Sequence, residues 1–114
     1  MINNYPEATK VTNVSENHII ITILASNSCE LFHGHFEETP IFPGIGQIDV
    51  AINMSSKYFG IEKNKFKDIP MVKFKKIIKP NDSLNLHLTK KIGVISFEYI
   101  LGDNVASSGR LKYE

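Results

Sequence analysis

The chain has 114 residues, of which 42% are hydrophobic and 22% are charged. This length suits one compact domain over residues 1–114 and is too short for two. Thirteen basic against twelve acidic residues give a net charge of +1, which argues against nucleic-acid binding through overall charge.

The positive charge is concentrated in one segment. Residues 57–79 hold eight lysines and two acids, whereas residues 1–56 hold one lysine and six acids. Two interpretations remain open for this segment. It could attract an acidic or phosphorylated partner, or its lysines could be the solvated side chains of a strand and of the loop that leads into it.

The only cysteine, Cys29, has no intrachain partner for a disulfide, and no Cys/His spacing typical of a zinc site is present. We therefore expect a reducing compartment and no bound metal. The first residues lack the basic and apolar regions of a signal peptide, and the apolar runs are only a few residues long. These features predict a cytoplasmic protein without a membrane span.

The first half of the chain predicts a strand, an irregular segment and a helix. A β-branched run predicts a strand from about His18 to Ala25. Residues 32–44 carry two prolines and two glycines, so they cannot form a regular element, and their apolar character indicates a site rather than a linker. Residues 45–59 are apolar on most helical faces, which predicts a buried helix that ends at Gly60.

The second half predicts antiparallel strands. Alternation predicts a strand over Met71–Lys79 with a bulge at Lys76, a hairpin of residues 84–91 and 94–101, and a last strand over 105–113. The element order predicts an α+β fold whose sheet wraps the helix. Because one sheet of this size leaves an edge or a face open, we also expect a dimer.

Asp49 and His35 stand out as candidate catalytic residues. In the predicted helix Asp49 lies one turn from Ile45 and Ile52, so its carboxyl group projects along an apolar stripe, where burial favours a protonated acid. His35 lies in the irregular segment, and an imidazole can accept a proton near neutral pH. Gly44 precedes the helix, so its N–H could polarise a carbonyl group.

The residues alone leave alternatives open at each position. Asp49 could be a hydrogen-bonded core residue, His35 could be an ordinary loop residue, and His33 rivals His35 as the base. The run Ser107-Ser108-Gly109 invites the assignment of a nucleophile. In a predicted strand, however, packing and backbone room for a neighbour is the stronger interpretation.

One motif resembles the signature of the 3-hydroxyacyl-acyl carrier protein dehydratases. Residues 32–49 read Phe-His-Gly-His-Phe-Glu-Glu-Thr-Pro-Ile-Phe-Pro-Gly-Ile-Gly-Gln-Ile-Asp. The family signature reads Phe-x-Gly-His-Phe-Pro, a spacer with Pro, then Pro-Gly and, six residues after that Pro, Glu or Asp. The resemblance continues through Lys73-Phe74 and residues 80–82 to residues 107–111. It implies the hotdog fold, an antiparallel sheet wrapped around one long central helix.

The resemblance also implies a reaction, the removal of water from a 3-hydroxyacyl thioester to give the trans-2-enoyl thioester. His35 matches the family's base and Asp49 its acid, with the two that work together coming from opposite subunits of a dimer. Gly44 matches the glycine whose N–H holds the thioester carbonyl. No metal or redox cofactor is implied, since the substrate is carried on phosphopantetheine, either of acyl carrier protein or of coenzyme A. The residues implied to line the acyl tunnel are Phe36, Ile41, Phe42, Ile45 and Ile52.

The motif departs from the usual pattern of the family and resembles one subgroup more closely. Glu37 stands where the family usually has Pro, and the run that ends in Asp49 is closer to small dehydratases of aryl polyene pathways. In those systems such a subunit can pair with a catalytically deficient relative, so a homodimer and a heterodimer are both compatible with the sequence. Asp in place of Glu also occurs in dehydratases that isomerise the double bond. A hotdog thioesterase and a non-catalytic acyl-binding subunit are the competing hypotheses.

Overall fold

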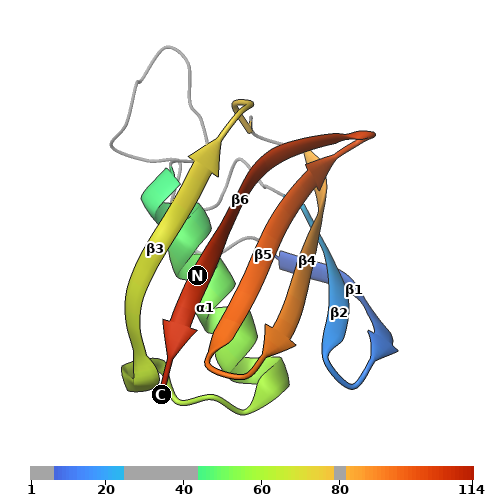
Figure 1. The fold of residues 1–114 in the computed structure, drawn as a ribbon. Coiled ribbons are helices and arrows are strands. Elements are labelled where there is room, and N and C mark those ends of the chain that lie inside the picture. The colour runs from blue at the N-terminus through green and yellow to red at the C-terminus, as the bar shows by residue number, and fades with distance from the viewer. Residues whose placement is uncertain (1–6, 25–43, 79–81) are drawn as a thin grey trace, which may run out of the picture.

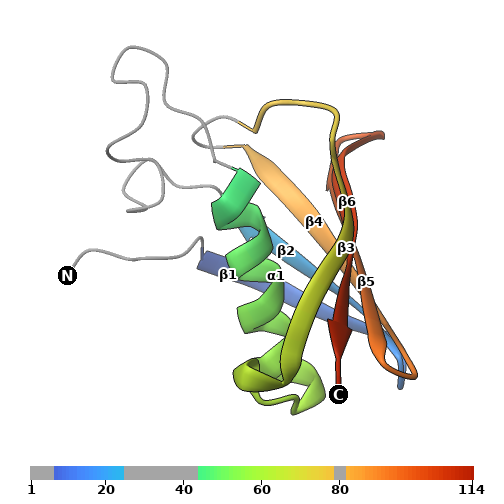
Figure 2. The ribbon, with the colours of Figure 1, turned by 60° about the vertical axis from the view of Figure 1, so that its left-hand side comes forward.

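The structure is a computed structural model that describes residues 7–24, 44–78 and 82–114. Within these residues six antiparallel strands form one sheet, in the order β1-β2-β4-β5-β6-β3 (Figure 1). A 16-residue helix, α1 (Gly44–Phe59), lies against one face of the sheet, and the 3-10 helix η2 (Lys63–Lys65) precedes β3 (Figure 2). This is the α+β hotdog arrangement that the sequence predicts. The strands are β1 (Glu7–Ser15), β2 (His18–Leu24), β3 (Phe66–Phe74), β4 (Ser83–Lys91), β5 (Val94–Leu101) and β6 (Asn104–Tyr113).

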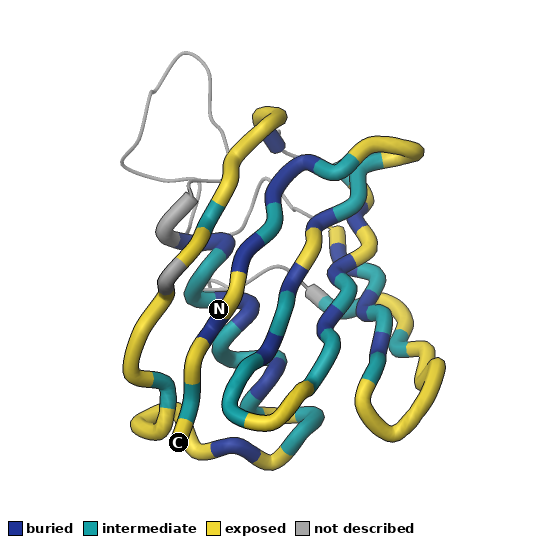
Figure 3. The backbone as a smooth tube through the Cα atoms, in the orientation of Figure 1, coloured by how far each residue is buried: buried dark blue, intermediate teal, exposed yellow. Residues whose placement is uncertain are grey.

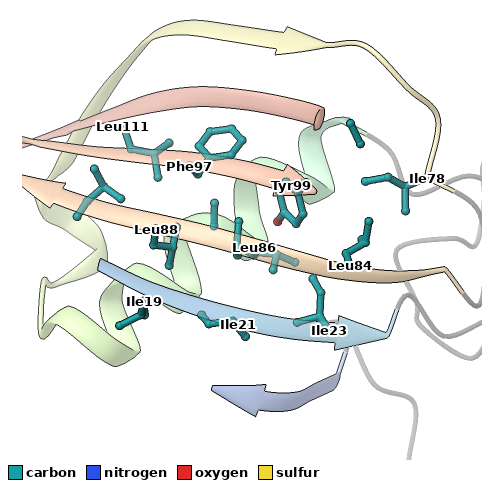
Figure 4. Close-up of a cluster of buried hydrophobic side chains, with 14 of the residues drawn as sticks. Ile19, Ile21, Ile23, Ile78, Leu84, Leu86, Leu88, Phe97, Tyr99 and Leu111 are labelled. Carbon is teal, nitrogen blue, oxygen red and sulfur yellow. The ribbon is translucent and has the colours of Figure 1, made fainter. Parts of the chain in front are cut away.

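The hydrophobic core lies between α1 and the inner face of the sheet (Figure 4). Alternate residues of β2, β4 and β5 point inwards and are almost fully buried, so Ile21 of β2 lies opposite Leu86 of β4, which in turn lies opposite Tyr99 of β5. A slip of one residue would turn every inward side chain to the solvent. Figure 3 shows this alternation as bands of buried and more exposed residues along the strands. The alternation seen in the sequence therefore fixes the register of these three strands.

Helix α1 is buried on the side that faces the sheet. Its other side is only half-buried, so the prediction of a helix covered on nearly every side is wrong for this chain by itself. The helix begins at Gly44, one residue earlier than predicted. It ends before Gly60, which takes a φ of 71° and donates its N–H to the oxygen of Ser56, as expected for a helix-closing glycine. The buried residues of the helix are Gly46, Gln47, Val50, Ala51 and Ser55.

Strand β3 differs from the prediction, because it covers Phe66–Phe74 rather than Met71–Lys79. Asp68 and Pro70 interrupt the alternation of the sequence, and the pairing with β6 shifts register on both sides of Asp68. Proline in a strand is confined to edges and irregularities, and β3 is the edge of the sheet. The strand ends where the N–H groups of Lys75 and Lys76 both donate to the oxygen of Ala106, at 2.8 and 3.0 Å, so the irregularity expected at Lys76 closes the strand.

Strand β1 was not predicted at all. Its sequence, EATKVTNVS, is largely polar and shows little alternation. Among the described strands β1 pairs with β2 alone, at the edge of the sheet opposite β3. Most of its residues are exposed there, so a strand can form without a strong alternation of apolar and polar residues. The hairpin of β4 and β5 and the last strand β6 are confirmed, with Gly93 and Gly102 at positive φ in the two tight turns between them.

Two histidines meet on the face of the sheet that points away from α1. Nε2 of His18 on β2 lies 3.2 Å from Nδ1 of His87 on β4, and Glu98 of β5 is paired opposite His87. Burial lowers the pKa of His87, the neighbouring His18 lowers it further, and Glu98 opposes the change. The contact therefore favours a neutral His87.

Mild acid is expected to weaken the fold through this pair. Because the pKa of His87 is lowered in the folded state, the unfolded chain binds more protons once the pH falls below about 6.5. The stabilisation is complete above that pH and is lost as the pH falls towards the lowered pKa. Urea unfolding should give a lower free energy of unfolding at pH 5.5 than at pH 7.5, and His87→Gln should make this difference smaller. The reduction should be less than about 1 kcal/mol, because partly exposed charges interact weakly. Equal losses in the two proteins would contradict this origin.

Candidate active site

The structure describes four of the predicted site residues, and all four belong to α1: Gly44, Ile45, Asp49 and Ile52. The remaining predicted residues and the rival base lie outside the described part of the chain: His33, His35, Phe36, Ile41 and Phe42. The approach of His35 to Asp49 thus stays a prediction. The described half of the site is the start of a helix and the acid that this helix carries.

Asp49 lies in the second turn of α1, on the side that points away from the sheet of its own chain. At 100° per residue, it stands roughly 150° from the middle of the buried, sheet-facing side. The carboxyl group is half-buried, with the half-buried Ile52 on the same exposed side of the helix. Among the described residues of the expected apolar stripe, Ile52 is therefore only half-buried, and a second surface could cover this side of α1.

Asn53 is the side chain that contacts Asp49 from one turn further along the helix. Its Nδ2 donates to the main-chain oxygen of Asp49 at 2.8 Å and to the carboxylate Oδ1 at 3.4 Å. The longer contact is a weak hydrogen bond that restrains the rotation of the carboxyl group. Sequence reasoning missed Asn53, although a polar residue four positions after a candidate acid is the signal that could have found it.

Gly44 is the first residue of α1, as its predicted role requires. The first N–H groups of a helix have no acceptor within it, and the helix dipole places partial positive charge there. The structure places Gly44 at this end of α1, and its role in binding a carbonyl group stays a prediction. A carbonyl oxygen that gains negative charge during a reaction would be stabilised at this position.

Two buried hydroxyl groups of the sheet donate to Gln47 in the first turn of α1. The hydroxyl of Tyr99 on β5 donates to the main-chain oxygen of Gln47 at 2.7 Å, and the hydroxyl of Ser107 on β6 donates to Oε1 of Gln47 at 2.6 Å. Burial raises the pKa of Tyr99 well above its ordinary value, and the negative charge of Asp49 raises it further. Because the hydroxyl of Ser107 donates its proton to Gln47 in a buried hydrogen bond, the structure speaks against a role of Ser107 as a nucleophile.

Two hollows flank the half-buried side of α1. One, of about 330 Å³, is lined by Ile52 of the helix and by residues of β3, including Phe66 and Ile69. The other, of about 290 Å³, is lined by Asn53 and by two lysines, Lys57 and Lys63. The first combines apolar residues with the charged Lys67 and Asp68, and the second has positive charge beside the contact partner of Asp49.

Within the described ranges, no group of three or more His, Cys, Asp or Glu side chains is placed to hold a metal ion. In the same part of the chain, no helix is both long and apolar enough to cross a membrane.

Comparison with known proteins identifies the family. The family described as ApeI-like, ApeI dehydratase, matches residues 11–110. The 3-hydroxyacyl-[acyl-carrier-protein] dehydratase FabZ of Lactobacillus helveticus is 31% identical over an alignment of 96 residues, which covers 74% of this chain and only 64% of that protein. The solved dehydratase heterocomplex ApeI:P from Xenorhabdus doucetiae superposes with a TM-score of 0.84 at 26% identity, covering 94% of this chain and 96% of that one.

A further solved structure shares the fold. An uncharacterized protein from Erwinia carotovora subsp. atroseptica superposes with a TM-score of 0.76 at 24% identity and covers all of this chain and 97% of that one. The match over residues 11–110 also includes most of β1, the strand that the sequence did not reveal. The chain belongs to the ApeI-like dehydratase family, whose members are related to FabZ.

Proposed function

We propose that this protein removes water from a 3-hydroxyacyl group that acyl carrier protein presents as a thioester, and releases the trans-2-enoyl thioester. The observation that carries the proposal is the position of Asp49. In a chain of this family, Asp49 places a carboxyl group on the side of α1 that also carries Ile52, about one turn from the start of the helix, where N–H groups can bind a carbonyl oxygen.

The chemistry follows from these groups. His35 takes the proton from C2 of the substrate while the thioester oxygen, held near the N–H of Gly44, gains negative charge. Asp49 gives its proton to the hydroxyl on C3, which leaves as water, and the electron pair of the C2–H bond forms the C2–C3 double bond. Each proton has a donor and an acceptor, so the step balances without a redox or metal cofactor.

The lining of the site fits a thioester of this kind. The apolar part of the hollow beside Ile52, formed with Phe66 and Ile69, suits part of an acyl chain, in line with the predicted role of Ile52. The hollow with Lys57 and Lys63 suits the phosphate of phosphopantetheine. The other lysines of the basic segment that the structure describes are exposed around η2 and β3, where an acidic carrier protein could dock: Lys65, Lys67, Lys73, Lys75 and Lys76.

A second copy of the chain completes the site in this proposal. The open side of α1 carries Asp49 away from its own sheet, and the free edge of β3 next to it exposes main-chain groups together with Ile69, Met71 and Phe74, at 39%, 44% and 52% exposure. Edge strands with exposed apolar side chains pair readily with another chain. Pairing along β3 would cover the open side of α1 and let His35 of one subunit meet Asp49 of the other.

Met71→Lys is expected to weaken this dimer by at least about tenfold, because a lysine at a pairing edge opposes strand addition. Native mass spectrometry over a dilution series would measure the dissociation constant. Ile92→Lys, at a fully exposed residue in the turn between β4 and β5, is the matched control and should leave the dimer intact. Equal weakening by both variants would contradict pairing along β3.

The partner and the pathway are finer proposals. We infer a homodimer. A related hotdog subunit is the alternative partner, because the solved structure reported above with the higher TM-score is the heterocomplex ApeI:P. We also infer a polyene-type pathway from the motif that ends in Asp49. Activity of the purified chain alone supports the homodimer. Activity that arises only after a second hotdog protein is added would overturn it.

The reaction itself is tested with the purified chain and a 3-hydroxyacyl acyl carrier protein. Mass spectrometry should show loss of one water from the acyl group, and ultraviolet absorbance should show the enoyl thioester. Free carrier with a released hydroxy acid would indicate a thioesterase instead. Bound acyl ligand without turnover would indicate a non-catalytic subunit.

A further inference from the structure

Two strands reach the start of α1 through side-chain hydroxyls. Tyr99 and Ser107 are directly opposite each other in the pairing of β5 with β6, so both side chains point to the same face of the sheet. Both donate to Gln47, one to its main-chain oxygen and the other to its side-chain Oε1. Tyr99 and Ser107 are fully buried and Gln47 is 3% exposed. Within the described chain this arrangement ties one residue of the helix to two neighbouring strands.

The tied residue belongs to the segment that carries the proposed chemistry. Gln47 lies three residues after Gly44 and two residues before Asp49. The first turn of a helix has few hydrogen bonds of its own and frays readily. A turn held to the sheet at two atoms of Gln47 cannot shift without breaking buried hydrogen bonds, and a buried donor left unpaired is costly.

Tyr99 keeps its proton under all ordinary conditions. Its ring is inside the core, beside Phe97 at a centroid distance of 6.0 Å (Figure 4). The same burial and the charge of Asp49 raise the pKa of Tyr99 well above its ordinary value. The hydroxyl therefore remains a donor to Gln47 across the whole pH range in which a dehydratase could be assayed.

We propose that Tyr99 and Ser107 are positioning residues that act through Gln47 to hold Asp49 and the N–H groups at the start of α1 in one catalytic geometry. The inference rests on the proposed dehydration, since Asp49 and Gly44 act only there. A displacement of about 1 Å of a catalytic group can lower a rate by as much as about 100-fold. The tie thus has a catalytic consequence beyond its contribution to folding.

Tyr99→Phe tests the inference, because it removes one hydroxyl and keeps the buried ring. We expect kcat to fall about tenfold while KM stays within about twofold, since the substrate contacts are untouched and only the geometry of the reacting groups is disturbed. Ser107→Ala should act in the same direction through Oε1 of Gln47. Steady-state kinetics of folded protein, checked by circular dichroism and thermal melting, would measure both variants.

Two matched variants separate positioning from stability. Tyr113→Phe removes a tyrosine hydroxyl that donates to the main-chain oxygen of Lys91 at 2.8 Å, away from α1. Ser55→Ala removes a buried serine hydroxyl within α1 that donates to the oxygen of Ala51 at 2.7 Å and makes no tie to the sheet. Both should keep kcat within about twofold of the wild type, whatever their melting temperatures.

The outcomes are distinguishable. Unchanged kcat in Tyr99→Phe and Ser107→Ala, with enoyl product from the wild type, overturns the inference and leaves the proposed function standing. A loss of kcat in Ser55→Ala as large as in Tyr99→Phe also overturns the inference, because the effect would then follow stability. If Tyr99→Phe does not fold, Ser107→Ala decides. No enoyl product from the wild type overturns the function and the inference together.

Discussion

Asp49→Asn is expected to lower the kcat of dehydration by about 10²–10⁴-fold, the usual contribution of a general acid. The substitution keeps the size of the side chain and an oxygen that can accept the hydrogen bond from Asn53, but it removes the proton that the leaving hydroxyl must receive. Melting temperature should change little, since Asp49 is half-buried and the side-chain contact that the described residues make with its carboxylate is a weak one, from Asn53. Initial rates of enoyl formation, with a melting curve for each protein, would measure the effect.

The control for this prediction is Asp103→Asn. Asp103 is an exposed acid in the turn between β5 and β6, so its neutralisation makes the same change in net charge far from α1. It should keep full activity. His35→Ala should reproduce the loss seen with Asp49→Asn, because each residue handles one of the two protons. Wild-type turnover in Asp49→Asn would sink the assignment of the acid.

Gly109→Ala is expected to destabilise the fold by about 1–3 kcal/mol, which corresponds to a fall in Tm of about 5–15 °C. A Cβ atom at this position would lie 2.6 Å from Cε2 of Phe97 and 2.8 Å from the main-chain oxygen of Met71. The ring is packed in the core and the oxygen belongs to β3, so neither can move without disturbing its neighbours. Urea unfolding at fixed pH would give the loss of unfolding free energy.

The adjacent Ser108→Ala is the control for that measurement. Ser108 is half-buried and lies opposite Glu98 and Lys73, which are both exposed. Its substitution should change stability by less than about 0.5 kcal/mol. A similar cost at both positions would mean that close packing of Gly109 is not the cause. The contact also confirms the expectation that this part of Ser107-Ser108-Gly109 serves packing and backbone room.

The sequence was sufficient to predict those elements in which burial of one face imposes a regular spacing of apolar residues. The alternation of leucines in β4 and the β-branched run of β2 predict strands because one face of each must be apolar. The apolar helix between Gly44 and Gly60 was predicted within one residue for the same reason. Asp49 was selected as the candidate acid because a carboxyl group inside such an apolar pattern conflicts with it.

The sequence was insufficient where the pattern is weak or where contacts join distant residues. Both edge strands, β1 and β3, face solvent over much of their length, so burial leaves little mark on their composition. The contacts of Gln47 with Tyr99 and Ser107 span more than fifty positions of the chain. No local spacing encodes such a pairing, and it becomes visible only when the register of β5 and β6 is known.

The free energy of local unfolding should be lower for β1 than for the central strands of the sheet. Among the described strands β1 pairs with β2 alone, it adds only the partly buried Ala8 and Val11 to the core, and its register is interrupted at two places, near Ala8 and near Ser15. The strands β2, β4, β5 and β6, by contrast, share one buried core with α1. Strand β1 can therefore detach from the sheet at a low free-energy cost while the helix that carries Asp49 remains packed on the core.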